Sequence, residues 1–155
     1  MIKKLAIVLL VLMFGNTLYG QTLEETKDWI KEKLETFRYQ EPGFPNVFTV
    51  SFDDENITFH FKRTSYGSTY ETETTIPVKE MQQIRFSENK NTVWIVFRVK
   101  NGKDIKYLYN QKIELKNETN LIMDKDILND DLEERLKKAF KSLISSYGGS
   151  LEEAY

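Results

Sequence analysis

Alternating apolar and polar positions predict strands through the middle of the chain. Residues 48–52 and 57–61 both alternate in this way, as half-buried strands do. The polar turn 53–56 lies between them and places Val50 opposite Phe59. All apolar side chains of the pair then share one face of a hairpin.

Tyr66 and Gly67 are expected to form the two-residue loop of a second hairpin, which pairs Phe59 with Thr74. On the opposite face, the same register pairs His60 with Glu73. A slip by one residue would place acidic side chains on the apolar face. The apolar row and the charged row therefore select the same register.

The Asn-Gly sequence within residues 100–102 predicts a third hairpin, because this dipeptide is a strong turn signal. A three-residue loop with Gly102 in the left-handed conformation pairs Phe97 with Ile105. A two-residue loop would instead place Lys106 on the apolar face. We therefore expect the three-residue loop.

Shorter segments complete the expected set of strands. A strand at residues 84–86 leads through the polar turn 88–91 into a strand at 92–99. We expect residues 113–115 to continue the sixth strand and residues 121–123 to form a seventh, with a turn at residues 117–120 between them.

Amphipathic patterns predict one helix on each side of these strands. Residues 23–38 carry an apolar stripe at helical spacing and an acidic opposite face. The acidic face opposes binding to anionic membranes, so we expect this helix to pack on its own domain. Residues 129–147 carry a broader apolar face that includes Leu136, Phe140 and Leu143.

The expected fold class is α+β, with a meander of about seven antiparallel strands between the two helices. This element order, over residues 47–147, resembles a pleckstrin-homology-like (PH-like) barrel. The resemblance implies that the last helix closes one barrel end, with Leu136, Phe140 and Leu143 as its plug. The helix at 23–38 is an addition to that pattern. The alternative is a strongly curved sheet with both helices on one face.

The start of the chain has the pattern of an export signal. Lys3 and Lys4 precede an apolar run at residues 5–14. This run is shorter than the roughly 20 residues of a membrane span, but it fits the core of a signal peptide. We expect cleavage between Gly20 and Gln21 and a periplasmic or secreted protein without a stable membrane anchor. This start resembles that of small uncharacterised exported proteins of Bacteroidota.

The chain therefore divides into a signal peptide (1–20), a helix and linker (21–45), a strand domain with its C-terminal helix (46–149) and a tail (150–155). The formal charge of −2 becomes −4 when residues 1–20 are removed with their two lysines and no acid. This charge gives no general attraction to nucleic acid. The absence of cysteine and the single histidine exclude thiol chemistry and a multi-histidine zinc site within one chain. We expect no cofactor and no metal ion.

His60, the single histidine, is the candidate for acid–base chemistry. Glu71 and Glu73 share its face in the expected register, so a His60/Glu73 pair is available for proton transfer. The alternative is an ordinary cross-strand charge pair on a solvated face. No residue supplies a nucleophile positioned by His60.

Acidic residues 53–55 could bind calcium, which prefers several carboxylate oxygens. They lack the alternating ligands and the glycine of a calcium loop, so a tight polar turn is the simpler interpretation. They also stand where the resemblance to PH-like barrels would need basic residues for a phosphoinositide. We therefore exclude phosphoinositide binding through this turn.

Two functions fit these patterns. The first is an exported, non-catalytic module that binds a protein, peptide or small ligand through its barrel rim or an edge strand. The second is a small exported enzyme that uses the histidine–glutamate pair. The first is favoured because catalytic constellations are missing. Aromatic residues near the expected turns could form an interaction patch or the rim of the core: Phe44, Tyr66, Tyr70 and Phe86.

Overall fold

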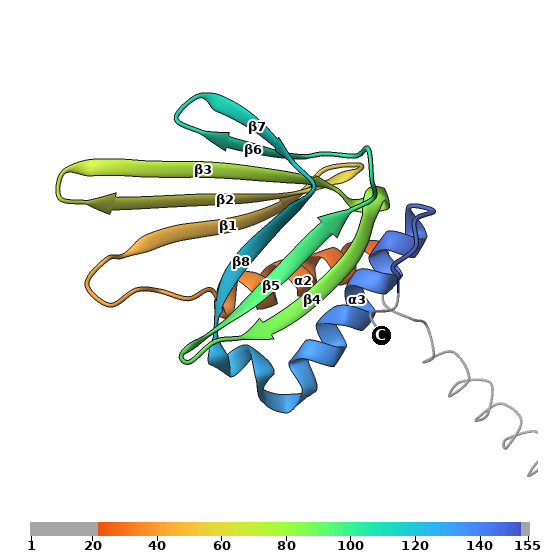
Figure 1. The fold of residues 1–155 in the computed structure, drawn as a ribbon. Helices are drawn as coiled ribbons and strands as arrows, with labels where there is room; N and C mark the ends of the chain where they lie inside the picture. Colours follow the sequence, from red (N-terminus) through yellow and green to blue (C-terminus); the bar gives the residue numbers. More distant parts are fainter. Residues whose placement is uncertain (1–21, 153–155) are drawn as a thin grey trace, which may run out of the picture.

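The computed structural model describes residues 22–152 and shows an α+β fold with antiparallel strands between an N-terminal and a C-terminal helix (Figure 1). The helices are α2 (Leu23–Thr36) and α3 (Leu132–Ser146), with short 3-10 helices η1 (Val78–Glu80) and η2 (Lys125–Asp131). The strands are β1 (Asn46–Phe52), β2 (Asn56–Ser65), β3 (Ser68–Pro77), β4 (Met81–Glu88), β5 (Thr92–Val99), β6 (Ile105–Tyr109), β7 (Lys112–Lys116) and β8 (Glu118–Asp124). The predicted signal peptide and its cleavage bond lie outside the described residues.

The strands of residues 22–152 form two separate sheets rather than a closed barrel. The larger sheet has the order β1-β2-β3-β6-β7, and the smaller has the order β4-β5-β8. Of the two expected arrangements, the curved sheet therefore fits and the PH-like barrel does not.

The predicted registers of the first two hairpins are confirmed. Val50 lies opposite Phe59, which in turn lies opposite Thr74. Tyr66 and Gly67 form the second turn, with φ angles of 49° and 76°. Two positive φ angles are typical of the tight turns whose twist matches that of antiparallel strands.

The predicted third hairpin is wrong. β5 pairs with β4 and β8, whereas β6 pairs with β3 and β7, so Phe97 and Ile105 lie in different sheets. Gly102 does adopt the left-handed conformation, with φ of 77°. Its turn carries the chain from one sheet to the other instead of closing a hairpin.

The last part of the strand region also differs from the expectation. A turn at Asn110 and Gln111, with φ angles of 47° and 65°, separates β7 from β6. The expected turn at residues 117–120 is mostly strand, because β8 begins at Glu118. The described chain therefore has eight strands rather than seven.

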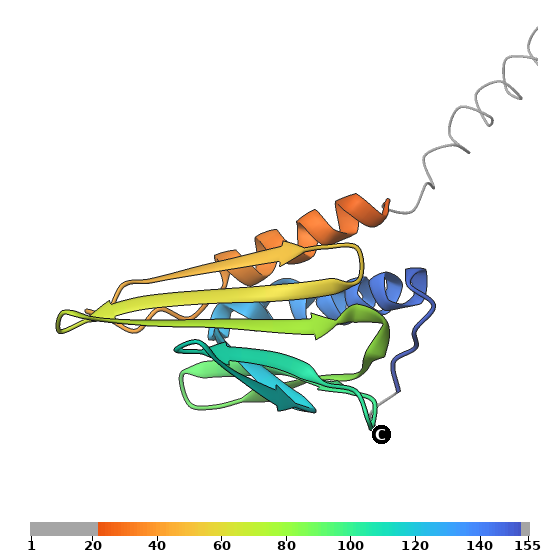
Figure 2. The same cartoon turned by 90° about the horizontal axis from the view of Figure 1, so that it is seen from above.

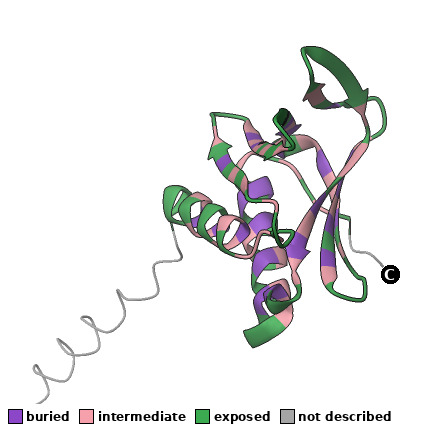
Figure 3. Ribbon diagram, turned by 90° about the vertical axis from the view of Figure 1, so that its left-hand side faces the viewer, coloured by how far each residue is buried: buried purple, intermediate pink, exposed green. Residues whose placement is uncertain are grey.

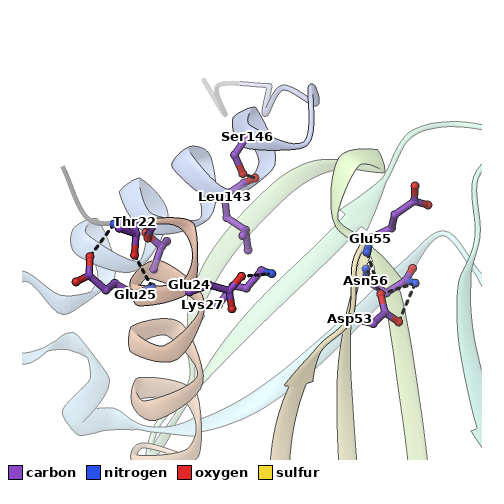
Figure 4. Close-up of polar contacts among 10 residues, drawn as sticks. Thr22, Glu24, Glu25, Lys27, Asp53, Glu55, Asn56, Leu143 and Ser146 are labelled. Carbon is purple, nitrogen blue, oxygen red and sulfur yellow. Dashed lines mark hydrogen bonds and ion pairs between the residues drawn. The ribbon is translucent and has the colours of Figure 1, made fainter. Parts of the chain in front are cut away.

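Local hydrogen bonds account for the helix boundaries. At the start of α2, the Thr22 hydroxyl accepts a hydrogen bond from the backbone N–H of Glu25. In return, the Glu25 carboxylate accepts a hydrogen bond from the backbone N–H of Thr22 (Figure 4). This capping box satisfies two N–H groups that have no partner within the helix. The second helix begins at Leu132 rather than 129, because Asn129 and Asp130 have non-helical backbone angles.

The hydrophobic core lies between the two helices and the two sheets. Buried residues gather on the helix and strand surfaces that face one another (Figure 3). Figures 1 and 2 show α2 and α3 alongside each other, and the two helices are in contact. The predicted plug residues Leu136, Phe140 and Leu143 are all buried. They fill a layered core rather than the end of a barrel.

The segment that follows α2 runs beside β8. Arg38 forms an isolated bridge with Met123, and the Asp124 backbone N–H donates to the Phe37 carbonyl at 2.7 Å. These contacts place Arg38 against the smaller sheet. The tail predicted at 150–155 also packs on the domain where it is described, since the Glu152 N–H donates to a β4 carbonyl at 2.8 Å.

Candidate functional site

The inner face of the larger sheet continues beyond the core as an open groove of about 960 Å³. Residues 118–122 of β8 form the facing wall. Because side chains of a strand alternate between the two faces of its sheet, every second residue from Phe59 to Ser65 of β2 and from Ser68 to Thr74 of β3 points into this groove. Six aromatic side chains line it: Phe48, Phe59, Phe61, Tyr70, Tyr107 and Tyr109.

The groove exists because the long β2–β3 hairpin extends beyond the smaller sheet (Figure 1). Phe59, at its inner end, is 2% exposed and packs against Phe97 of the core at 5.4 Å between ring centroids. Tyr70, near the hairpin end, is 41% exposed. An apolar surface that is continuous with the core is therefore left open to solvent.

The aromatic side chains support one another across the strands. The Phe61 and Tyr70 rings meet edge-on at 6.0 Å, and Tyr70 lies 5.1 Å from Tyr109. The Tyr70 and Tyr107 hydroxyls are 3.3 Å apart. This hydrogen bond, together with burial, raises the pKa of Tyr70 to about 12. Ring pairs at such distances contribute stability in addition to that from the apolar area that they bury. The contacts between these rings therefore stabilise the wall of the groove.

Arg38 is the most unusual residue of the groove. Its guanidinium carbon lies 4.9 Å from the centre of the Phe48 ring and 5.2 Å from that of Phe61. Nη1 donates to the Ile122 carbonyl at 2.6 Å, whereas Nε is buried without a hydrogen-bond partner. Burial lowers the pKa of Arg38 to about 10, so the side chain remains a cation at neutral pH.

The other charged side chains of the groove have partners of opposite charge. Arg63 pairs with Glu41 at 2.8 Å, and Lys116 pairs with Glu114 at 3.1 Å. The Glu118 carboxylate pairs with two arginines of the smaller sheet, Arg85 and Arg98. Within residues 22–152, Arg38 makes no ion pair, so its charge is the one left uncompensated in the groove.

His60 lies on the opposite, outer face of the larger sheet. The predicted register with Glu73 is confirmed, but the hydrogen bond of His60 goes diagonally to Glu71, at 2.6 Å. This bond, with a smaller contribution from Lys62, lowers the pKa of Glu71. The His60 and Glu71 side chains are 34% and 51% exposed. His60 and Glu73 border a separate open hollow of about 390 Å³.

The acidic turn forms its hydrogen bonds internally. The Asp53 carboxylate accepts from the backbone N–H groups of Glu55 and Asn56 at 2.9 and 2.7 Å (Figure 4). The bond from Glu55 contributes most to lowering the pKa of Asp53. Across the described part of the chain, no three acidic or histidine side chains are grouped so that they could hold a metal ion.

The four aromatic residues singled out in the sequence do not form one patch. Tyr70 lines the groove, whereas Phe44 and Tyr66 pair with each other at 5.9 Å. Phe86 lies on β4, where Lys137 of α3 contacts its ring. No sequence pattern indicates that Arg38 is a site residue, because only the contact with β8, far along the chain, brings it to the groove.

Comparison with known proteins adds no assignment: no family model, no curated protein and no solved structure matches the chain. Between Thr22 and Glu152, no helix has both the length and the apolar character needed to cross a membrane.

Proposed function

We propose that this protein is an exported, non-catalytic module that binds a small molecule with an apolar body in the groove between its sheets. The open aromatic face of the larger sheet supports this proposal most directly. Its volume of about 960 Å³ lies near the upper end of the roughly 300–1,000 Å³ found for small-molecule sites. Such sites combine apolar and aromatic walls with a few polar groups.

The composition of the groove favours binding over catalysis. Its polar side chains are mainly hydroxyls and paired charges, and it includes Thr72 and Thr74, which are almost fully buried. His60, the acid–base candidate, is on the other face of the same sheet and is bonded to an exposed carboxylate. The groove can therefore bind and orient a ligand, whereas the hydrogen-bonded His60 and Glu71 side chains do not line it.

The binding proposal is tested with the fluorescence of phenylnaphthylamine, a neutral aromatic dye that brightens when it leaves water. We expect saturable binding to the mature protein and binding at least about tenfold weaker for Tyr107→Ala, which removes a ring from the groove wall. Trp94→Ala is the matched control, because Trp94 is a partly exposed aromatic residue of the smaller sheet outside the groove. Equal affinity of both variants and the unchanged protein would place the dye elsewhere.

Export is tested separately by mass analysis of the protein recovered from its own cells. A chain that begins at Gln21 in the periplasm or the medium is the expected result. A full-length chain that begins at Met1 in a membrane fraction would contradict export and cleavage, but it would leave the groove proposal intact.

A further inference from the structure

We infer that the ligand of the groove is an organic anion, whose carboxylate or other acidic group binds Arg38 while its apolar body lies along the aromatic wall. This inference rests on the proposed function, because it assigns the ligand class of the same groove.

The hydrogen bonding of Arg38 is the first observation. A guanidinium has five N–H donors in a planar arrangement that matches the two oxygens of a carboxylate. One donor of Arg38 is used by the Ile122 carbonyl, and the Nε–H is buried without an acceptor. Buried donors without acceptors are rare and unfavourable in folded proteins. Within the described residues, Nη2 also has no acceptor but is not enclosed, so an anion in the groove can accept hydrogen bonds from its N–H groups.

The second observation is the charge distribution around the groove. Arg63, Lys116 and Glu118 also line it, but each is in an ion pair with a residue other than Arg38. Among the described residues of the lining, the charge of Arg38 is therefore the one left without a partner, so a negative ligand group is attracted while a positive one is repelled. Because the Arg38 side chain is largely buried, this attraction is stronger than it would be on an open surface.

The third observation is the arrangement of the cation relative to the rings. Arg38 lies against Phe48 and Phe61 on one side and against the β8 backbone on the other. These contacts hold the guanidinium at the side of the groove, where an anionic group can reach it while the attached apolar body contacts the ring wall. An amphipathic molecule therefore fits the site better than a free inorganic anion, which would leave the aromatic surface uncovered.

The test compares two dyes that differ by one charge. Anilinonaphthalene sulfonate has the same aromatic body as phenylnaphthylamine and adds a sulfonate. For the unchanged mature protein, we expect the anionic dye to bind at least about tenfold more tightly, as is typical of a charge-assisted contact. Arg38→Met should abolish this preference, so that the two dyes bind the variant with affinities within about twofold of each other. Arg63→Met, at a paired arginine of the same groove, is the matched control and should keep the preference.

The possible results separate the inference from the proposal on which it rests. If both dyes bind the unchanged protein with equal affinity, the anion assignment is wrong and the groove remains a binding site. The same conclusion follows if Arg38→Met weakens both dyes equally. If neither dye binds, the proposed function itself fails. Circular dichroism checks that Arg38→Met is folded, and the comparison of the dyes on the unchanged protein requires no variant.

Discussion

Replacing Phe140 by alanine tests the packing that joins the C-terminal helix to the sheets. Phe140 is 0% exposed, and its ring meets that of Phe97 edge-on, with 5.6 Å between the centroids. Truncation of a buried phenylalanine costs about 3–5 kcal/mol, because apolar contacts are lost and a cavity remains. Roughly 0.5–1.5 kcal/mol of this loss belongs to the ring pair itself. Domains of this size have a free energy of unfolding of about 5–15 kcal/mol, so the variant should be severely destabilised.

Urea denaturation followed by circular dichroism measures this loss in the chain from Gln21 onward. Phe44→Ala is the control, because Phe44 is only half-buried and lies outside the core; we expect it to change the free energy of unfolding by less than about 1 kcal/mol. A double-mutant cycle with Phe97→Leu and Phe140→Leu isolates the ring pair. A loss below about 1 kcal/mol for Phe140→Ala would refute the described position of α3 in the core.

Three further predictions concern single contacts. Thr22→Ala should lower the free energy of unfolding by about 1 kcal/mol through loss of the helix cap, and Thr22→Ser should restore it. Gly149→Ala should cost about 1–3 kcal/mol, measured by urea denaturation, since the new Cβ would lie 2.5 Å from a backbone oxygen. An NMR titration should find the pKa of Glu71 below its ordinary 4.5, and His60→Gln should raise it. Because this pKa is lowered by folding, the hydrogen bond favours the folded state at pH values above the ordinary 4.5, and its contribution is lost on acidification through the lowered pKa.

The sequence allowed the register of the first two hairpins to be predicted, because two independent rows of side chains constrain it. A one-residue slip of β2 against β3 would bury acids and expose phenylalanines. The same argument failed for β5, because its five consecutive apolar residues, 93–97, include no charged row that would fix the register. Such a run is compatible with several neighbouring strands, so it does not define which strand lies beside it.

The candidate groove could not be predicted from the sequence, because it depends on contacts between distant parts of the chain. Its tyrosines could be placed on strands, but only the separation of the two sheets leaves their inner face open. Arg38 is brought to the groove by its bridge to Met123, a contact between distant parts of the chain. No local motif marks such a residue. By contrast, the acidic turn at Asp53 was interpreted correctly as a tight turn, because all the groups that satisfy it lie within three residues.

From Thr22 to Glu152, the chain passes between the sheets three times, and each passage is short. It crosses through η1, through the turn that contains Gly102, and through Asn117 alone between β7 and β8. Short connections leave the sheets little freedom to open or close relative to each other. The groove is therefore preorganised, and the ligand that we propose should bind with little loss of backbone entropy and little change in the shape of the protein.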